Sequence, residues 1–377
     1  MIITPPETAI SRKDKLITQV DMTLTTRAFL SGLILLISLL STAGTRAANT
    51  HEDALEFDDF PLSEALSLPD WFSLSFLDLK ESLNEAIDDG KKGMIIYFGR
   101  KDCAYCKTLL EVNWGDPAIV RYTRQHFNVI AVDVTGARTV TDFDGKTMSE
   151  REYSAYRKTN FTPTLVFYNA KGQVTLKLSG YRPVYQFRAA LEYAADAHYN
   201  REPFRKYLAR AEASLSFGSE EINEKDFFSP PPYNLDRTHT RLAKIKSKPL
   251  VVFFEHPRCH ACDVFHGGTL SHSEILSQFD RLAAVQLNTL QDTPVITPKG
   301  KRTTAREWAN ELNLTFAPAL LFFDDNGNEI LRVESVIQLY RLKNVLRYII
   351  GEKYREFPTF QSWLHHYRSQ LKSSRKP

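Results

Sequence analysis

The sequence has few cysteines, little net charge and only one long apolar run among its 377 residues. The formal net charge is +3, and basic residues are scattered among acidic ones, which argues against a nucleic-acid-binding stripe. No second apolar run approaches the length of a spanning helix, so we expect no membrane association of the mature chain. A disulfide-stapled scaffold would spread its cysteines along the chain, whereas all four cysteines here lie in two short motifs.

The one long apolar run lies near the N-terminus, at residues 28–40. Arg27 precedes it, and small residues follow it at 43–48. This order is typical of a signal peptide, and the run is short for a spanning helix. We therefore expect residues 1–48 to be a signal peptide and the protein to be periplasmic or otherwise exported.

The four cysteines form two Cys-x-x-Cys motifs, Cys103/Cys106 and Cys259/Cys262. An apolar, β-favouring run precedes each motif, at 94–98 and at 250–254. A further such run follows Pro163 in one half and Pro318 in the other, 60 and 59 residues after the first cysteine of the motif. Agreement over this length indicates an internal duplication.

Apolar spacing predicts the elements of the repeated unit. In the first half we expect helices at 77–87, 116–126, 149–158, 184–199 and 201–213, strands at 94–98, 127–134, 161–168 and 173–179, and a polar loop at 135–146. In the second half the hairpin partner and the closing helix recur at 329–333 and 337–350. Two strands interleaved with helices, followed by a hairpin and a helix, indicate an α/β sandwich with a mixed sheet.

The domain organisation follows from the repeat and from composition. Residues 49–75 are acidic and loosely patterned, and residues 229–232 read Ser-Pro-Pro-Pro, which is typical of an extended linker. The predicted order is a signal peptide at 1–48, an acidic arm at 49–75, a first domain at 76–215, a linker at 216–239 and a second domain at 240–377.

With a Cys-x-x-Cys motif opening a helix and a proline strand opposite it, each half resembles a thioredoxin-fold domain, over about residues 76–200 and 240–352. The polar insertion before the proline and the pair Gly180-Tyr181 are similar to exported thioredoxin-related proteins, such as the periplasmic thioredoxin of bacterial sulfur-oxidation systems. The resemblance implies an α/β fold with two thioredoxin-like domains in tandem, each a mixed central sheet flanked by helices.

The motifs suit thiol–disulfide exchange, in which a thiolate is the attacking species. A cysteine at a helix N-terminus is stabilised as a thiolate by unpaired backbone N–H groups and the helix dipole. We therefore assign Cys103 and Cys259 as nucleophiles, and Cys106 and Cys262, one turn along, as the resolving thiols. No cofactor is expected beyond these redox-active disulfides.

The resemblance also implies that the two prolines are cis, a form that X–Pro bonds adopt at low cost. An exposed backbone beside each proline would then bind a substrate peptide. The substrate-binding residues expected on this basis are Thr162, Pro163, Ala317 and Pro318.

The sequence departs from thioredoxin around both motifs. Tyr97 and Phe253 stand where thioredoxin has a buried acid. Lys101 and Arg258 precede the nucleophiles, and nearby cations favour a thiolate. His260, as an imidazolium inside the second motif, would stabilise the thiolate and make that disulfide the more oxidising of the two.

Three functions remain after this reasoning. The first is an exported thiol–disulfide oxidoreductase that exchanges disulfides with protein or small-molecule thiols and with a redox partner protein. The second is a metal-binding protein or metallochaperone, because a soft N/S cluster suited to Cu(I) or Zn(II) can be drawn from His256, Cys259, His260, Cys262 and His266. A non-catalytic redox sensor or scaffold is a third possibility. Metal content after purification under reducing conditions would separate the second from the first.

Overall fold

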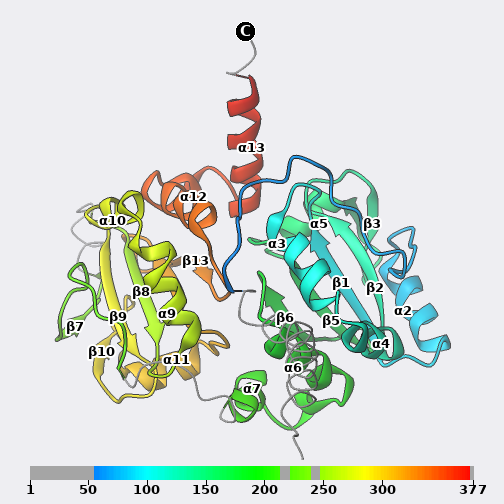
Figure 1. The fold of residues 1–377 in the computed structure, drawn as a ribbon, viewed down its shortest axis with the longest axis horizontal. Helices are drawn as coiled ribbons and strands as arrows, with labels where there is room; N and C mark the ends of the chain where they lie inside the picture. Colours follow the sequence, from blue (N-terminus) through cyan, green and yellow to red (C-terminus); the bar gives the residue numbers. More distant parts are fainter. Residues whose placement is uncertain (1–54, 213–220, 239–246, 374–377) are drawn as a thin grey trace, which may run out of the picture. The chain divides into compact units, whose positions relative to one another are not determined.

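The computed structural model describes residues 55–212, 221–238 and 247–373 (Figure 1). The predicted signal peptide, the first residues of the arm and parts of both domain boundaries lie outside the described residues. One compact unit runs from His51 to Pro377 and contains both cysteine motifs. In the described ranges, no helix has the length and apolar character needed to cross a membrane.

A four-stranded mixed sheet forms the centre of the first half, in the order β2-β1-β5-β6 (Figure 1). Its strands are β1 Gly93–Gly99, β2 Phe127–Asp133, β5 Thr164–Asn169 and β6 Val174–Ser179. Strand β1 runs parallel to β2 and antiparallel to β5, which in turn pairs antiparallel with β6. Every residue of β1 is buried, because helices cover both faces of the sheet, and this explains its unbroken apolar run.

Several helices of the first half begin at side-chain caps that the sequence already contains. Asp78 and Asp116 cap α2 and α4, and Ser149 caps α5 through a capping box with Glu152. The helices are α2 Leu79–Asp88, α3 Ala104–Thr108 with its π-helical continuation Leu109–Asn113, α4 Pro117–His126, α5 Glu150–Tyr156, α6 Val184–Ala195 and α7 Phe204–Glu212. The predicted helices are confirmed, although the one expected at 184–199 ends at Ala195 and is followed by the 3-10 turn His198–Asn200.

The second half repeats the first, with the sheet order β13-β12-β8-β9 and the same strand directions. Its elements are β8 Leu250–Glu255, α9 His260–Gly267, α10 Ser273–Phe279, β9 Ala283–Asn288, α11 Ala305–Glu311, β12 Ala319–Phe323, β13 Glu329–Val333, α12 Leu339–Ile350 and α13 Phe360–Ser373. The predicted architecture, two α/β units each with a mixed central sheet flanked by helices, is therefore confirmed. We call residues 55–212 the first module and residues 221–373 the second module.

The regions expected to be loop, linker and arm contain more structure than predicted. The polar loop at 135–146 carries the strand β3 Thr139–Thr141, which pairs with β4 Thr147–Ser149. Its counterpart in the second module pairs β10 Pro294–Ile296 with β11 Arg302–Thr304 and with β7 Tyr233–Asn234. Strand β7 belongs to the predicted linker, and Phe227 and Phe228 pack against the second module's core. The described part of that linker is thus attached to the second module, and the arm supplies Leu55 and Phe72 to the first module's core.

The two modules exchange equivalent phenylalanine side chains. Phe161 and Phe316 each lie two residues before the proline of their own module. Phe316 belongs to the core cluster of the first module, whereas Phe161 belongs to a core cluster of the second. They are 1% and 6% exposed, respectively. Burial of one phenylalanine ring contributes roughly 1.5–3 kcal/mol, so this reciprocal contact stabilises the docked pair of modules in the manner of a two-fold interface.

A close backbone approach completes this interface. The N–H of Val336 donates to the carbonyl of Tyr181 at 3.2 Å. Beside this bond, Gly180 lies against Ser335: a Cβ on Gly180 would be 2.2 Å from Ser335 Oγ and 2.5 Å from Ser335 Cβ. Gly180 also has a φ of +87°, a backbone conformation that residues with a side chain rarely adopt. A side chain at this position would therefore strain the backbone and clash with Ser335.

The variant Gly180→Ala should therefore lose more stability than Gly145→Ala. Both positions have positive φ, but a Cβ on Gly145 would have no other atom within 4 Å. Overpacking should cost Gly180→Ala about 1–3 kcal/mol beyond the backbone strain that both variants share. Urea unfolding measures the difference, and adding Ser335→Gly should restore most of it. Equal losses in the two single variants would contradict the close approach.

Candidate active site

Both motifs form disulfides at the start of a helix. Cys103 is the N-cap residue of α3, and its Sγ accepts a hydrogen bond from the N–H of Cys106 at 3.0 Å. Cys259 caps α9 in the same way, with Cys262 N–H at 3.1 Å. The Cα atoms of each pair are 5.1 Å apart, within the range for a disulfide. The structure thus places the predicted nucleophiles at helix N-termini, and their roles stay predictions.

All four cysteines are buried in this oxidised state. Cys103 and Cys259 are 3% and 6% exposed, whereas Cys106 and Cys262 are 0% and 1% exposed. The order agrees with the expected roles, because the first cysteine of each motif is slightly the more accessible. The difference is small, however, so reaction with a large partner requires some local opening at either motif.

The peptide bonds Thr162–Pro163 and Ala317–Pro318 are both cis, as the resemblance implied. In the first module Thr162 lies directly against the nucleophile, with its Oγ1 3.2 Å and its carbonyl oxygen 3.6 Å from Cys103 Sγ. The corresponding Ala317 is only half-buried.

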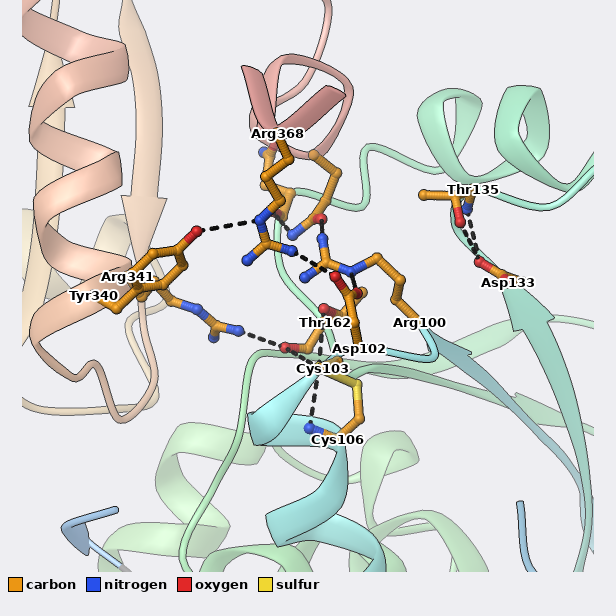
Figure 2. Close-up of polar contacts among 12 residues, drawn as sticks. Arg100, Asp102, Cys103, Cys106, Asp133, Thr135, Thr162, Tyr340, Arg341 and Arg368 are labelled. Atoms are coloured by element: carbon orange, nitrogen blue, oxygen red, sulfur yellow. Dashed lines mark hydrogen bonds and ion pairs between the residues drawn. A yellow bond between two sulfur atoms is a disulfide. The ribbon is translucent and has the colours of Figure 1, made fainter. Parts of the chain in front are cut away.

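The expectation of an exposed backbone beside Pro163 is wrong. Thr162 is 1% exposed, and its carbonyl accepts a hydrogen bond from Arg341 Nη2 at 2.7 Å (Figure 2). Arg341 lies on α12 of the second module. The docked second module therefore covers the backbone that would bind a peptide at the first motif. The sequence gives no sign of this contact, because it joins residues 179 positions apart.

A small pocket beside Cys103 is lined by charged side chains of both modules, and we call it the inter-module pocket. These charged residues are Asp59, Arg100, Asp102, Arg341 and Arg368. Asp102 pairs with Arg100 and, at 3.1 Å, with Arg368, while Arg100 Nη1 donates to Gln361 at 3.1 Å (Figure 2). Burial, together with the nearby Arg368, lowers the pKa of Arg100 to about 10, although Asp102 opposes the shift.

Asp59, from the predicted acidic arm, organises the other side of this pocket. Its carboxylate accepts the N–H groups of Tyr340 and Arg341 at 2.9 and 2.8 Å and the hydroxyl of Tyr105 at 2.9 Å. The Arg341 guanidinium lies 3.3 Å from the centroid of the Tyr105 ring, a cation–π contact. Burial raises the pKa of Asp59 and of Tyr105 and lowers the pKa of Arg341. Sequence reasoning missed Asp59 because its arm showed only an acidic composition.

The second module contains a buried acid, although at a different position from the one at which thioredoxin has its acid. Glu255, the last residue of β8, is fully buried and pairs with His266 Nε2 at 2.8 Å and with Gln286 Nε2 at 2.8 Å. His266 follows Cys262 by one turn of α9, so the pair lies under the second motif. In the first module the corresponding positions are Gly99 and Leu110, which carry no charge.

The residues that we expected to tune the two thiolates differ in their solvent exposure. The side chains of Lys101 and Arg258 are exposed, whereas His260 is half-buried. The Nδ1 atom of His256 lies 2.8 Å from the carbonyl of Pro257. Because exposed charges are screened by solvent, the buried Arg341 is a closer candidate than Lys101 for tuning the first motif.

The residues of the alternative metal site are not brought together. His266 is held by Glu255, and Cys259 and Cys262 are joined to each other. Over the part of the chain that the structure describes, no group of three or more His, Cys, Asp or Glu residues is arranged to hold a metal ion. The cluster drawn from His256, Cys259, His260, Cys262 and His266 thus lacks a metal-binding geometry.

One side of the second motif is largely apolar. A hollow next to it is lined by Leu55, Ala261, Phe316, Pro318 and Ile337. It borders Cys262 through Ala261 and the cis proline through Pro318, and Val336 from the module interface also lines it. The two motifs therefore have the same local geometry but different surroundings: a charged pocket lies beside the first, and a largely apolar hollow together with the buried Glu255–His266 pair lies beside the second.

Comparison with known proteins supports the repeat. The model of the thioredoxin-like domain matches residues 79–195 and again residues 237–350. Similar solved structures include a thioredoxin-fold protein from Helicobacter pylori, with 24% identity, a TM-score of 0.30 and coverage of 39% of this chain and 90% of that one. A thioredoxin from Thermus thermophilus has 26% identity and a TM-score of 0.25, over 32% of this chain and 86% of that one. A disulphide isomerase from Xylella fastidiosa has 17% identity and a TM-score of 0.23, over 40% and 99%. No curated protein matches the chain.

Removing the buried acid should destabilise the protein. Glu255→Ala leaves His266 and Gln286 without their buried partner, and we expect a loss of about 3 kcal/mol in the free energy of unfolding. Urea unfolding measures this loss. Glu274→Ala is the matched control, because Glu274 pairs with Lys343 at the surface and its loss should have little effect. A similarly small effect in both variants would show that the buried pair contributes nothing.

Alkylation should distinguish the two cysteines of each motif. In the reduced protein at pH 6, iodoacetamide should label Cys103 and Cys259 before Cys106 and Cys262, because the backbone N–H groups stabilise the first thiolates. Mass spectrometry of peptides measures the order, with the oxidised protein as an unlabelled control. Faster labelling of the second cysteines would reverse the assigned roles.

Proposed function

This chain belongs to the thioredoxin-like domain family, and we propose that it is an exported thiol–disulfide oxidoreductase that exchanges disulfides with protein or small-molecule thiols. One observation carries the proposal: in both modules a Cys-x-x-Cys disulfide caps a helix beside a cis proline. Export rests on the predicted signal peptide at residues 1–48, which lies outside the described residues.

Each reduced motif can transfer two electrons to a substrate disulfide. The thiolate of Cys103 or Cys259 attacks one substrate sulfur, which forms a mixed disulfide and releases the other substrate sulfur as a thiolate. Cys106 or Cys262, after losing its proton, then attacks the sulfur of its partner cysteine and releases the second substrate thiolate. The motif ends as a disulfide, and a redox partner protein returns it to the dithiol by the same steps in reverse. No cofactor beyond the cysteines takes part.

We assign protein substrates to the second motif. The backbone at Ala317 is half-buried, whereas Arg341 covers the equivalent backbone at Thr162. The largely apolar hollow at Ala261 and Pro318 lies beside the position that a substrate cysteine would occupy. The second motif thus has a less buried residue before its cis proline and an apolar surface beside it, and both favour peptide binding at this motif.

Substitution of the nucleophiles tests the proposed activity. In the reduction of insulin disulfides by dithiothreitol, the double variant Cys103→Ser/Cys259→Ser should show no rate above the uncatalysed reaction. The single variant Cys103→Ser should retain the part of the catalysed rate that the second motif contributes. Cys262→Ser should accumulate a mixed disulfide with insulin, visible on a non-reducing gel, because the resolving thiol is missing. A wild-type rate in the double variant would refute the proposed activity.

A further inference from the structure

We propose that Arg341 of the second module is a positioning residue of the first motif, which holds Thr162 against Cys103 and stabilises the Cys103 thiolate. The inference deepens the proposed function and rests on it. It makes the first motif a composite site, with cysteines from one module and its main uncompensated charge from the other.

Arg341 touches both sides of the first motif. Its Nη2 donates to the carbonyl of Thr162 at 2.7 Å, and Thr162 Oγ1 is 3.2 Å from Cys103 Sγ. Its guanidinium carbon also lies 3.3 Å from the centroid of the Tyr105 ring, and Tyr105 is one of the two residues between the cysteines of the motif. Arg341 is 8% exposed, so little water screens its charge.

The other charges around Cys103 largely balance each other. Arg100 and Arg368 share the carboxylate of Asp102. Asp59 accepts two backbone N–H groups and the Tyr105 hydroxyl, with Tyr340 supplying one of those N–H groups. These are the charged and titratable groups that face the pocket from the arm, from the segment before the motif and from α3, α12 and α13.

Arg341 itself lacks a direct counter-ion. Among the described residues it forms no ion pair within 4 Å, and its buried Nη1 has no hydrogen-bond partner. Reduction of the disulfide takes up two electrons and, with Cys106 as a thiol and Cys103 as a thiolate, one proton. The new negative charge forms beside the one buried guanidinium of this pocket that has no carboxylate partner. Stabilising the thiolate favours the reduced motif and therefore makes the disulfide more oxidising.

The second motif receives no comparable charge. Gln186, the third residue of α6, occupies the place that Arg341 has as the third residue of α12. Arg182 of the first module does reach the second module, but it donates to the carbonyl of Thr315, three residues before Pro318 rather than next to it. The buried Glu255 near the second motif pairs with His266, so this pair supplies no unpaired positive charge that could stabilise a thiolate there. We therefore expect the first motif to be the more oxidising, the reverse of the order that His260 suggested from the sequence.

The test uses the full mature chain with Arg341→Gln. The pH dependence of iodoacetamide labelling should show the pKa of the Cys103 thiol rising by about one unit, as expected for loss of a nearby opposite charge. In a glutathione titration the equilibrium constant for reduction of the first motif should fall about tenfold, equivalent to about 30 mV, while the second motif stays unchanged. Neither measurement needs a protein substrate, so failure of this inference is distinguishable from failure of the proposed activity.

Three further variants make the result specific. Arg341→Lys keeps the charge and should retain most of the wild-type potential. Arg347→Gln removes a charge from the same helix, where Arg347 lies over Tyr367 outside the pocket, and should change neither value. Gly180→Ala should open the same interface with Arg341 intact. It should change the pKa of the Cys103 thiol and the reduction equilibrium of the first motif in the same direction as Arg341→Gln. Unchanged Cys103 values in both Arg341→Gln and Gly180→Ala, or an equal shift in Arg347→Gln, would overturn the inference.

Discussion

The reciprocal burial of Phe161 and Phe316 is the interaction on which the rest of this structure depends. Each ring belongs to the loop before a cis proline, and each is packed into a core cluster that includes the other module. Burial of each ring stabilises the structure by roughly 1.5–3 kcal/mol, and the two rings thus anchor the two loops that flank the disulfides. Docking of the modules also covers the first motif and brings Arg341 to the carbonyl of Thr162.

Duplication has preserved the geometry of the motifs while the chemistry around them has diverged. The strand order, the strand directions and the helix-capping cysteines are the same in both modules. The differences lie in single side chains at equivalent positions of the two modules. The second module has the buried Glu255 where the first has Gly99, and the buried Arg341 where the first has Gln186. Because a thiolate responds to every nearby charge, two such changes are enough to give one fold two unlike redox sites.

The sequence predicted what depends on local pattern and missed what depends on distant contacts. Strand β1 is readable because all its residues are apolar, and α5 is readable because Ser149 and Glu152 form a capping box. Strand β3 has three residues, of which only Val140 is apolar, so it looks like a loop. Glu255 follows an apolar run, where a charged residue is expected to be exposed. In the structure its carboxylate is buried because it pairs with His266 and Gln286, which lie 11 and 31 residues further along the chain. Arg341 reads as a polar residue on an amphipathic helix, since its partner Thr162 lies in the other repeat.

A buried arginine with incomplete hydrogen bonding is costly, because its charge has lost most of its hydration. In the oxidised state Arg341 is compensated by the carbonyl of Thr162, by the rings of Tyr105 and Phe161 and by the more distant Asp59. A thiolate at Cys103 would supply the missing counter-charge, so reduction and docking favour each other. The two effects are reciprocal by thermodynamic linkage. If docking of the modules stabilises the reduced motif by a given free energy, reduction of the motif stabilises the docked modules by the same amount. The proposed role of Arg341 therefore makes the module interface itself sensitive to the redox state of the first disulfide.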